Sequence, residues 1–188
     1  MSEKKLYLLD AFALIYRAHF AFARNPRYNS KGMNTSAVFG FTNSLLEILN
    51  NQKPTHLGVV FDTPGQGIRE EIFSDYKANR DKMPEDIQLA IPYIKNLLKA
   101  LKIPIVSLEG YEADDLMGTL AVKAEELGFI TYLMTPDKDF AQLVNSNTFI
   151  YKPGRSGNPF QILGTKEVCE KFEIENPKQV IDILGLWG

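Results

Sequence analysis

Short apolar runs alternate along this chain with longer segments whose apolar residues recur at helical spacing. Residues 5–9 and 56–61 are runs of strand length, whereas the segment that begins at Pro84 carries an apolar residue every three or four positions. The pattern predicts strands at 5–9, 56–61, 103–108 and 129–135, and helices at 12–22, 36–50, from Pro84 onward, 114–127, 165–172 and 177–184. This alternation predicts an α/β fold with a mostly parallel sheet covered on both faces.

Four other segments refine this expectation. Apolar residues in 12–22 are too dense for a surface helix, so this helix should be largely buried. Segment 25–35 contains Pro, Asn and Gly and should form a loop. Segment 63–83 is rich in charge and broken by Pro and Gly, which indicates an insertion. Short apolar runs flank the turn-rich segment 153–159, which predicts a hairpin-like excursion.

Bulk composition fits one compact domain over residues 1–188, with 45% hydrophobic and 23% charged residues. Cys169 is the single cysteine, so no intrachain disulfide is possible, and residues 1–5 lack the apolar stretch of a signal peptide. No apolar run approaches the roughly 20 residues that span a bilayer. We therefore expect a cytoplasmic protein, and a monomer because no heptad seam is visible.

A net charge of −2 does not by itself suggest a nucleic-acid-binding protein, because such proteins are usually basic. The position of the acids changes this view, because each predicted strand is followed by one or more carboxylates. These acids would lie at the carboxyl ends of the parallel strands, where binding and catalytic sites of such sheets are usually found. The seven acids are Asp10, Asp62, Glu112, Asp114, Asp115, Asp137 and Asp139.

So many carboxylates at one edge would repel one another unless cations compensate them. Oxygen ligands favour Mg²⁺ or Mn²⁺, and the only histidines, His19 and His56, lie elsewhere in the sequence. We therefore predict two such metal ions. Each acid alone could instead be a turn former or a helix cap, and this alternative is strongest for Asp115 near the start of a predicted helix.

Several sequence blocks carry a resemblance to a known family. They are LLDAFALIYRAHFA (8–21), GMNTSAVFGF (32–41), VVFD (59–62), YKANR (76–80), GYEADDLMGTLA (110–121) and TPDKDFAQL (135–143). In this order they resemble the 5′-nuclease domains of bacterial DNA polymerase I, which are relatives of the flap endonucleases. The pair GYEADD and TPDKD is the most specific part, and the match covers nearly the whole chain.

The resemblance implies a resolvase-like, three-layer α/β domain with a helical arch at about 63–83. It implies Mg²⁺-dependent hydrolysis of DNA at 5′ flaps, nicks or RNA primers, as in replication and repair. By position, Asp10, Asp62, Glu112 and Asp114 match the ligands of a first metal, and Asp137 and Asp139 match those of a second, with Asp115 assisting. The residues that match the DNA-binding arch are Arg69, Tyr76, Lys77 and Arg80, of which Lys77 and Arg80 would also have catalytic roles.

The resemblance also implies a mechanism, in which two cations roughly 4 Å apart hold the scissile phosphate for attack by water. Lys77 and Arg80 would neutralise the charge that develops on it.

Two departures from the family pattern stand out. Ala11 replaces a frequent glycine, and the chain ends at Gly188, before the block Asp-x-x-Asp-Asn and a helix-hairpin-helix element. We therefore expect a fragment of a longer protein that in full length includes a polymerase, with an incomplete second metal site.

Three alternatives remain open at this stage. The chain could be a flap-DNA binding module that cuts poorly, or an RNase of the related PIN type, although the arch residues argue against the latter. A phosphotransfer receiver also has acids at strand ends, but it needs fewer of them. The interleaved acids and bases of the arch segment could also be a solvated charged face.

Overall fold

A six-stranded sheet forms the centre of the molecule. The computed structural model describes residues 3–63, 82–152 and 160–187. The strand order is β3-β2-β1-β4-β5-β6; β1 to β5 run parallel and β6 pairs antiparallel with β5. The strands are β1 (Lys5–Asp10), β2 (His56–Val60), β3 (Ile105–Val106), β4 (Ile130–Met134), β5 (Thr148–Lys152) and β6 (Gln161–Leu163). The predicted mostly parallel sheet is confirmed.

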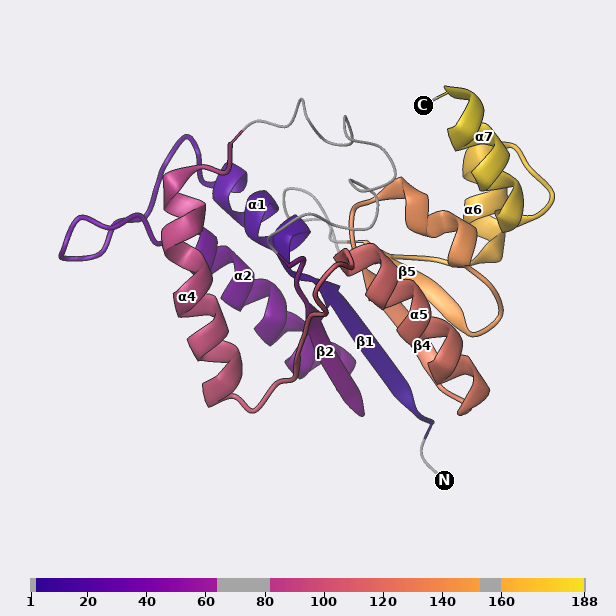
Figure 1. Ribbon diagram of the computed structural model, residues 1–188, viewed down its shortest axis with the longest axis horizontal. Helices are drawn as coiled ribbons and strands as arrows, with labels where there is room; N and C mark the ends of the chain where they lie inside the picture. The colour runs from indigo at the N-terminus through magenta and orange to yellow at the C-terminus, as the bar shows by residue number, and fades with distance from the viewer. Residues whose placement is uncertain (1–2, 64–81, 153–159, 188) are drawn as a thin grey trace.

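Helices cover both faces of this sheet, as Figure 1 shows. One face packs on α1 (Ala11–Ala21), α2 (Ser36–Glu47) and α4 (Glu85–Ala100). The other face packs on α5 (Ala113–Glu126), α6 (Thr165–Phe172) and α7 (Val180–Trp187), together with the short helix η2 (Lys138–Leu143). Two further short turns of helix are η1 (Ile48–Gln52) and η3 (Pro177–Gln179). Two separate apolar cores follow from this layering, one on each side of the sheet.

Strand β1 lies in the middle of the sheet, and its residues contribute to both cores. Tyr7 and Leu9 belong to the core under α1, whereas Leu8 belongs to the core under α5. All three are at most 2% exposed. A strand covered on both faces must be a continuous apolar run, which is the pattern the sequence has here.

Helices α1 and α2 approach each other closely at Gly40. A Cβ atom at this position would lie 2.6 Å from the Cβ of Ala18, which is nearer than two side chains can approach. Helix α1 is less buried than its density of apolar residues predicts, because Phe20 at its C-terminal end is 60% exposed. The expectation of a largely buried helix was therefore wrong for this end, where Phe20 and Ala21 are exposed.

Several predicted boundaries differ from the structure. Strand β3 has only two residues, where the sequence predicted six, because Pro104 at its start has no N–H to donate and the strand lies at the edge of the sheet. Pro84 is the N-cap of α4 and not a residue of its first turn. The π-helical turn η1 and the 3₁₀ helix η2 were not predicted. Among the described residues, no helix has the length and hydrophobicity that crossing a bilayer requires.

Candidate metal centre

Asp10 is the last residue of β1 and the N-cap of α1. Its Oδ1 accepts a hydrogen bond of 3.0 Å from the backbone N–H of Ala13, and its Oδ2 accepts one of 3.3 Å from the hydroxyl of Thr135. Thr135 follows β4, the neighbour of β1 in the sheet, and its side chain is fully buried. The carboxylate of Asp10 is thus held from both sides at the carboxyl edge of the two central strands.

Asp62 follows β2 at the same edge of the sheet. Its Oδ1 accepts a hydrogen bond of 2.8 Å from the backbone N–H of Ala113, the first residue of α5. This bond joins the end of β2 to the start of a helix that lies across the other face of the sheet. A carboxylate at this place also compensates the positive end of the helix dipole.

Three predicted acids gather where α5 begins. Glu112 is the N-cap in an extended conformation, and its backbone N–H donates to Oδ2 of Asp115 at 3.1 Å. Oδ1 of Asp114 accepts a hydrogen bond of 2.7 Å from the backbone N–H of Asp115. The bond from Glu112 gives Asp115 the helix-capping role that the sequence offered as the alternative to metal binding.

Asp137 and Asp139 lie directly after β4. The backbone N–H of Asp137 donates to the hydroxyl oxygen of Thr135 at 3.2 Å, and Oδ1 of Asp137 accepts from the backbone N–H of Asp139 at 3.0 Å. Asp137 has extended backbone and is the N-cap of η2, in whose first turn Asp139 lies. Thr135 therefore contacts both Asp10 and Asp137 and connects the two neighbouring strand ends.

Electrostatic coupling between these groups shows that they share one region. The pKa of Asp10 is raised to about 6, mainly by burial and also by the negative charges of Asp62 and Asp137, against the opposing effect of two hydrogen bonds. The pKa of Asp139 is raised mainly by burial and also by the charges of Asp137 and Asp114. The ends of β1, β2 and β4 and the start of α5 thus bring mutually repelling carboxylates together.

The carboxylates do not form a preassembled cage. In the described parts of the chain, no three acidic, histidine or cysteine side chains are grouped closely enough to hold a metal ion as they stand. The hydrogen bonds give a physical reason, because Asp10, Asp62, Asp114, Asp115 and Asp137 each turn an oxygen toward a backbone N–H. A carboxylate without a cation is stabilised by such a bond.

Comparison with known protein families identifies this arrangement. Residues 5–173 match the model of the family described as 5′-3′ exonuclease, N-terminal resolvase-like domain. The chain belongs to this family. The match spans β1 through α6 and so includes every candidate carboxylate.

Individual relatives of this 5′-3′ exonuclease domain agree with the family match. The 5′-3′ exonuclease of Aquifex aeolicus is 39% identical over 98% of the chain and 62% of its own length. DNA polymerase I of Bacillus caldotenax is 37% identical over 99% of the chain and 21% of its own length. The chain therefore spans about three fifths of the first relative and about one fifth of the second.

Solved structures of the bacteriophage T5 D15 protein share the fold of the exonuclease domain. The protein co-crystallised with metal ions superposes with a TM-score of 0.70 at 16% identity, over 95% of this chain and 64% of the other. The same protein, described as a flap endonuclease in a pseudo-enzyme-product complex with DNA and metal ions, superposes with a TM-score of 0.68 at 16% identity. That comparison covers 94% of this chain and 63% of the other. The predicted resolvase-like architecture is confirmed.

Four predicted residues of the exonuclease domain lie outside the described residues, namely Arg69, Tyr76, Lys77 and Arg80.

Some residues near the site were not predicted from the sequence. Thr135 was missed as the residue between Asp10 and Asp137, although its position directly before the TPDKD acids could have indicated it. A set of lysines near Asp137 was missed as well, because these lysines are far apart in sequence.

Proposed function

We propose that this chain hydrolyses phosphodiester bonds of DNA at or near 5′ ends with the help of divalent cations. The observation that carries the proposal is that Asp10, Asp62 and Asp137 lie at or just after the ends of three neighbouring parallel strands at one edge of the sheet, where Thr135 contacts both Asp10 and Asp137. Membership of the 5′-3′ exonuclease family and the DNA and metal ions bound to the T5 flap endonuclease support it. The substrates proposed are 5′ flaps, nicks and primers.

The donor atoms at this edge fit hard divalent cations. All of the candidate ligands are carboxylate oxygens, and the pKa of Asp10 is raised by burial and by neighbouring charges that a cation would compensate. Asp10, Asp62, Glu112 and Asp114 would hold one Mg²⁺ or Mn²⁺, and Asp137 and Asp139 would contribute to a second. When bound, such a pair supplies a nucleophilic water at neutral pH and stabilises the leaving 3′-oxygen.

The chain's own residues would position these ligands. Ala13 and Thr135 hold the two oxygens of Asp10, so that its carboxylate keeps a fixed orientation at the end of β1. Asp115 fixes the start of α5 through the N–H of Glu112 and thereby orients Glu112 and Asp114. Lys77 and Arg80 are proposed to neutralise charge on the phosphate, each contributing about 3 kcal/mol to transition-state stabilisation.

Cleavage of a 5′-labelled flap DNA tests this proposal. The 188-residue chain would be compared in Mg²⁺, in Mn²⁺ and in a chelator, beside Asp10→Asn and the matched control Asp182→Asn on the exposed face of α7. Cleavage that needs the cation, is lost in Asp10→Asn and is kept in Asp182→Asn supports the proposal. Cleavage that persists in the chelator or in Asp10→Asn contradicts it.

A DNA-binding module that does not cut is the second candidate. The observation that favours it is that five of the candidate carboxylates accept hydrogen bonds from backbone N–H groups and that the described residues do not form a ready cage. The same flap DNA distinguishes the two. Binding without cleavage in either cation would support the module and exclude the nuclease.

A further inference from the structure

A small hollow lies beside the carboxylate site, on the side of β4 toward β5 and β6. Its lining includes Thr135, Pro136 and Asp137, which also border the candidate metal centre. Its apolar lining includes Ile150, Leu163 and Phe172. The hollow therefore shares a wall with the site at which a phosphodiester would be cut.

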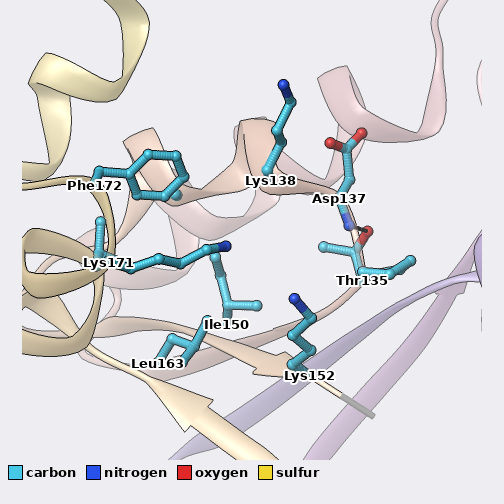
Figure 2. Close-up of a pocket in the computed structure, with 11 residues that line it drawn as sticks. Thr135, Asp137, Lys138, Ile150, Lys152, Leu163, Lys171 and Phe172 are labelled. Atoms are coloured by element: carbon cyan, nitrogen blue, oxygen red, sulfur yellow. Dashed lines mark hydrogen bonds between the residues drawn. The ribbon is translucent and has the colours of Figure 1, made fainter. Parts of the chain in front are cut away.

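Three lysines from three different elements line this hollow. Lys138 is the first residue of η2, Lys152 is the last residue of β5, and Lys171 lies in the last turn of α6. Figure 2 shows the ammonium groups of Lys152 and Lys171 extending toward each other in front of Ile150, with Lys138 extending outward beside Asp137. The fold thus brings together charges that lie far apart in the sequence.

No salt bridge within the described part of the chain explains why the ammonium groups of Lys152 and Lys171 converge. None of the three lysines forms a salt bridge within the described part of the chain, whose ion pairs join Lys5 to Glu3 and Lys166 to Glu170. The pKa of Lys171 is lowered by burial and then by the charges of Lys152 and Lys138, so the three repel one another. Such repulsion is relieved by an anion between them.

We propose that Lys152 and Lys171, with Lys138 at the rim, bind a phosphate group of the DNA strand that enters the carboxylate site. The inference rests on the proposed function and adds a contact that holds the strand beside Asp137. Lysine suits a phosphate as a point charge that needs no fixed angle. The apolar lining from Ile150, Leu163 and Phe172 borders the hollow without adding competing acceptors.

The test combines two measurements on the 188-residue chain, namely DNA binding by fluorescence anisotropy in Ca²⁺ and flap cleavage in Mg²⁺. The variant is the double substitution Lys152→Gln with Lys171→Gln. The matched control is Lys123→Gln with Lys178→Gln, which removes the same charge from exposed positions on α5 and η3. Thermal unfolding of all proteins separates a loss of binding from a loss of folding.

We expect the double substitution of Lys152 and Lys171 by Gln, here called the hollow variant, to bind DNA with a Kd about tenfold higher than that of the wild type. The slope of log Kd against log salt should fall by about one, as for one lost phosphate contact. The KM for cleavage should rise in parallel while kcat changes less than twofold, and Lys→Arg at both positions should restore binding. A hollow variant that behaves like the control pair, in a wild type that binds and cuts DNA, overturns the inference.

Two further comparisons complete the design. If the loss appears only with a 5′-phosphorylated flap and not with its 5′-hydroxyl form, the hollow binds the terminal phosphate; an equal loss assigns it to an internal phosphodiester. A wild type that binds DNA through these lysines without cutting it overturns the proposed catalysis and supports the phosphate site. A wild type that neither binds nor cuts overturns both.

Discussion

The carboxylate of Asp62 accepts a hydrogen bond of 2.8 Å from the backbone N–H of Ala113. This contact joins the end of β2 to the first turn of α5, which carries Asp114 and Asp115. The same side chain is a candidate metal ligand and raises the pKa of Asp10. Asp62 therefore has a structural and a chemical role that substitution can separate.

Substitution of Asp62 by Asn and by Ala should separate these roles. Asn keeps an oxygen that can accept from Ala113, and it removes both the repulsion of Asp10 and the charge that compensates the helix dipole, so Asp62→Asn should be close to the wild type in stability without cations, and inactive. Asp62→Ala leaves that N–H without its partner and should be less stable than Asp62→Asn by about 1–2 kcal/mol. Urea unfolding with flap cleavage measures both effects. Equal stability of the two variants would exclude the structural role.

The raised pKa of Asp10 predicts how stability depends on pH without divalent cations. Between pH 3.8 and about 6 the folded protein keeps a proton on Asp10 that the unfolded chain has lost. The folded state then binds more protons, so the contribution of Asp10 to stability falls as pH rises through this window, by at most about 3 kcal/mol. Urea unfolding between pH 3.5 and 7 should show this decline in the wild type relative to Asp10→Asn. Parallel curves would contradict it.

Divalent cations should stabilise the folded chain, and more so at pH 7 than at pH 5. A cation competes with the proton on Asp10, so its apparent affinity falls when that group is protonated. At a concentration of 100 Kd, binding at one site adds about 2.7 kcal/mol. Thermal unfolding with and without Mg²⁺ measures the shift in Tm, which should survive in Asp182→Asn and shrink in Asp10→Asn. Equal shifts at both pH values would argue against a role for Asp10.

The close approach of α1 and α2 predicts that Gly40→Ala is destabilising. The added Cβ would meet Ala18, and separating the two helices should cost about 1–3 kcal/mol. Gly185→Ala in α7 is the matched control, because nothing lies within 4 Å of its added Cβ, and it should be neutral or stabilising. Urea unfolding of both variants tests this. A Gly40→Ala variant as stable as the wild type would show that the helices adjust freely.

The sequence predicted the layers of the fold well because strong periodicity reports burial directly. Leu8 and Leu9 point to opposite faces of β1, and both had to be apolar for a sheet that is covered on both sides. Prediction was weaker where tertiary contacts decide. Residues 103–108 have the composition of a strand, but only Ile105–Val106 pairs, because Pro104 has no N–H to donate and the strand lies at the edge of the sheet.

For the candidate site, the sequence predicted the positions of the acids along the strands but not their tertiary contacts. The position of Asp10, Asp62 and Asp137 at strand ends follows from the strand pattern, so their shared edge could be expected. The hydrogen bonds of these carboxylates could not be predicted from the sequence, because the bond from Ala113 to Asp62 depends on how α5 lies across the sheet. The convergence of Lys152 with Lys171 likewise requires the packing of α6 and carries no local sequence signal.

The order of strands also determines when the site can form during folding. Strand β1 pairs with β2, which follows soon in the chain, but its other partner β4 lies far later, with Lys5 opposite Ile130. Closing so long a loop is slow, and the contact of Thr135 with Asp10 must wait for it. During synthesis, the contact of Thr135 with Asp10 can therefore form only after residue 135 has left the ribosome. Pairing of β4 with β1 is then the step that brings Thr135 and Asp137 to Asp10.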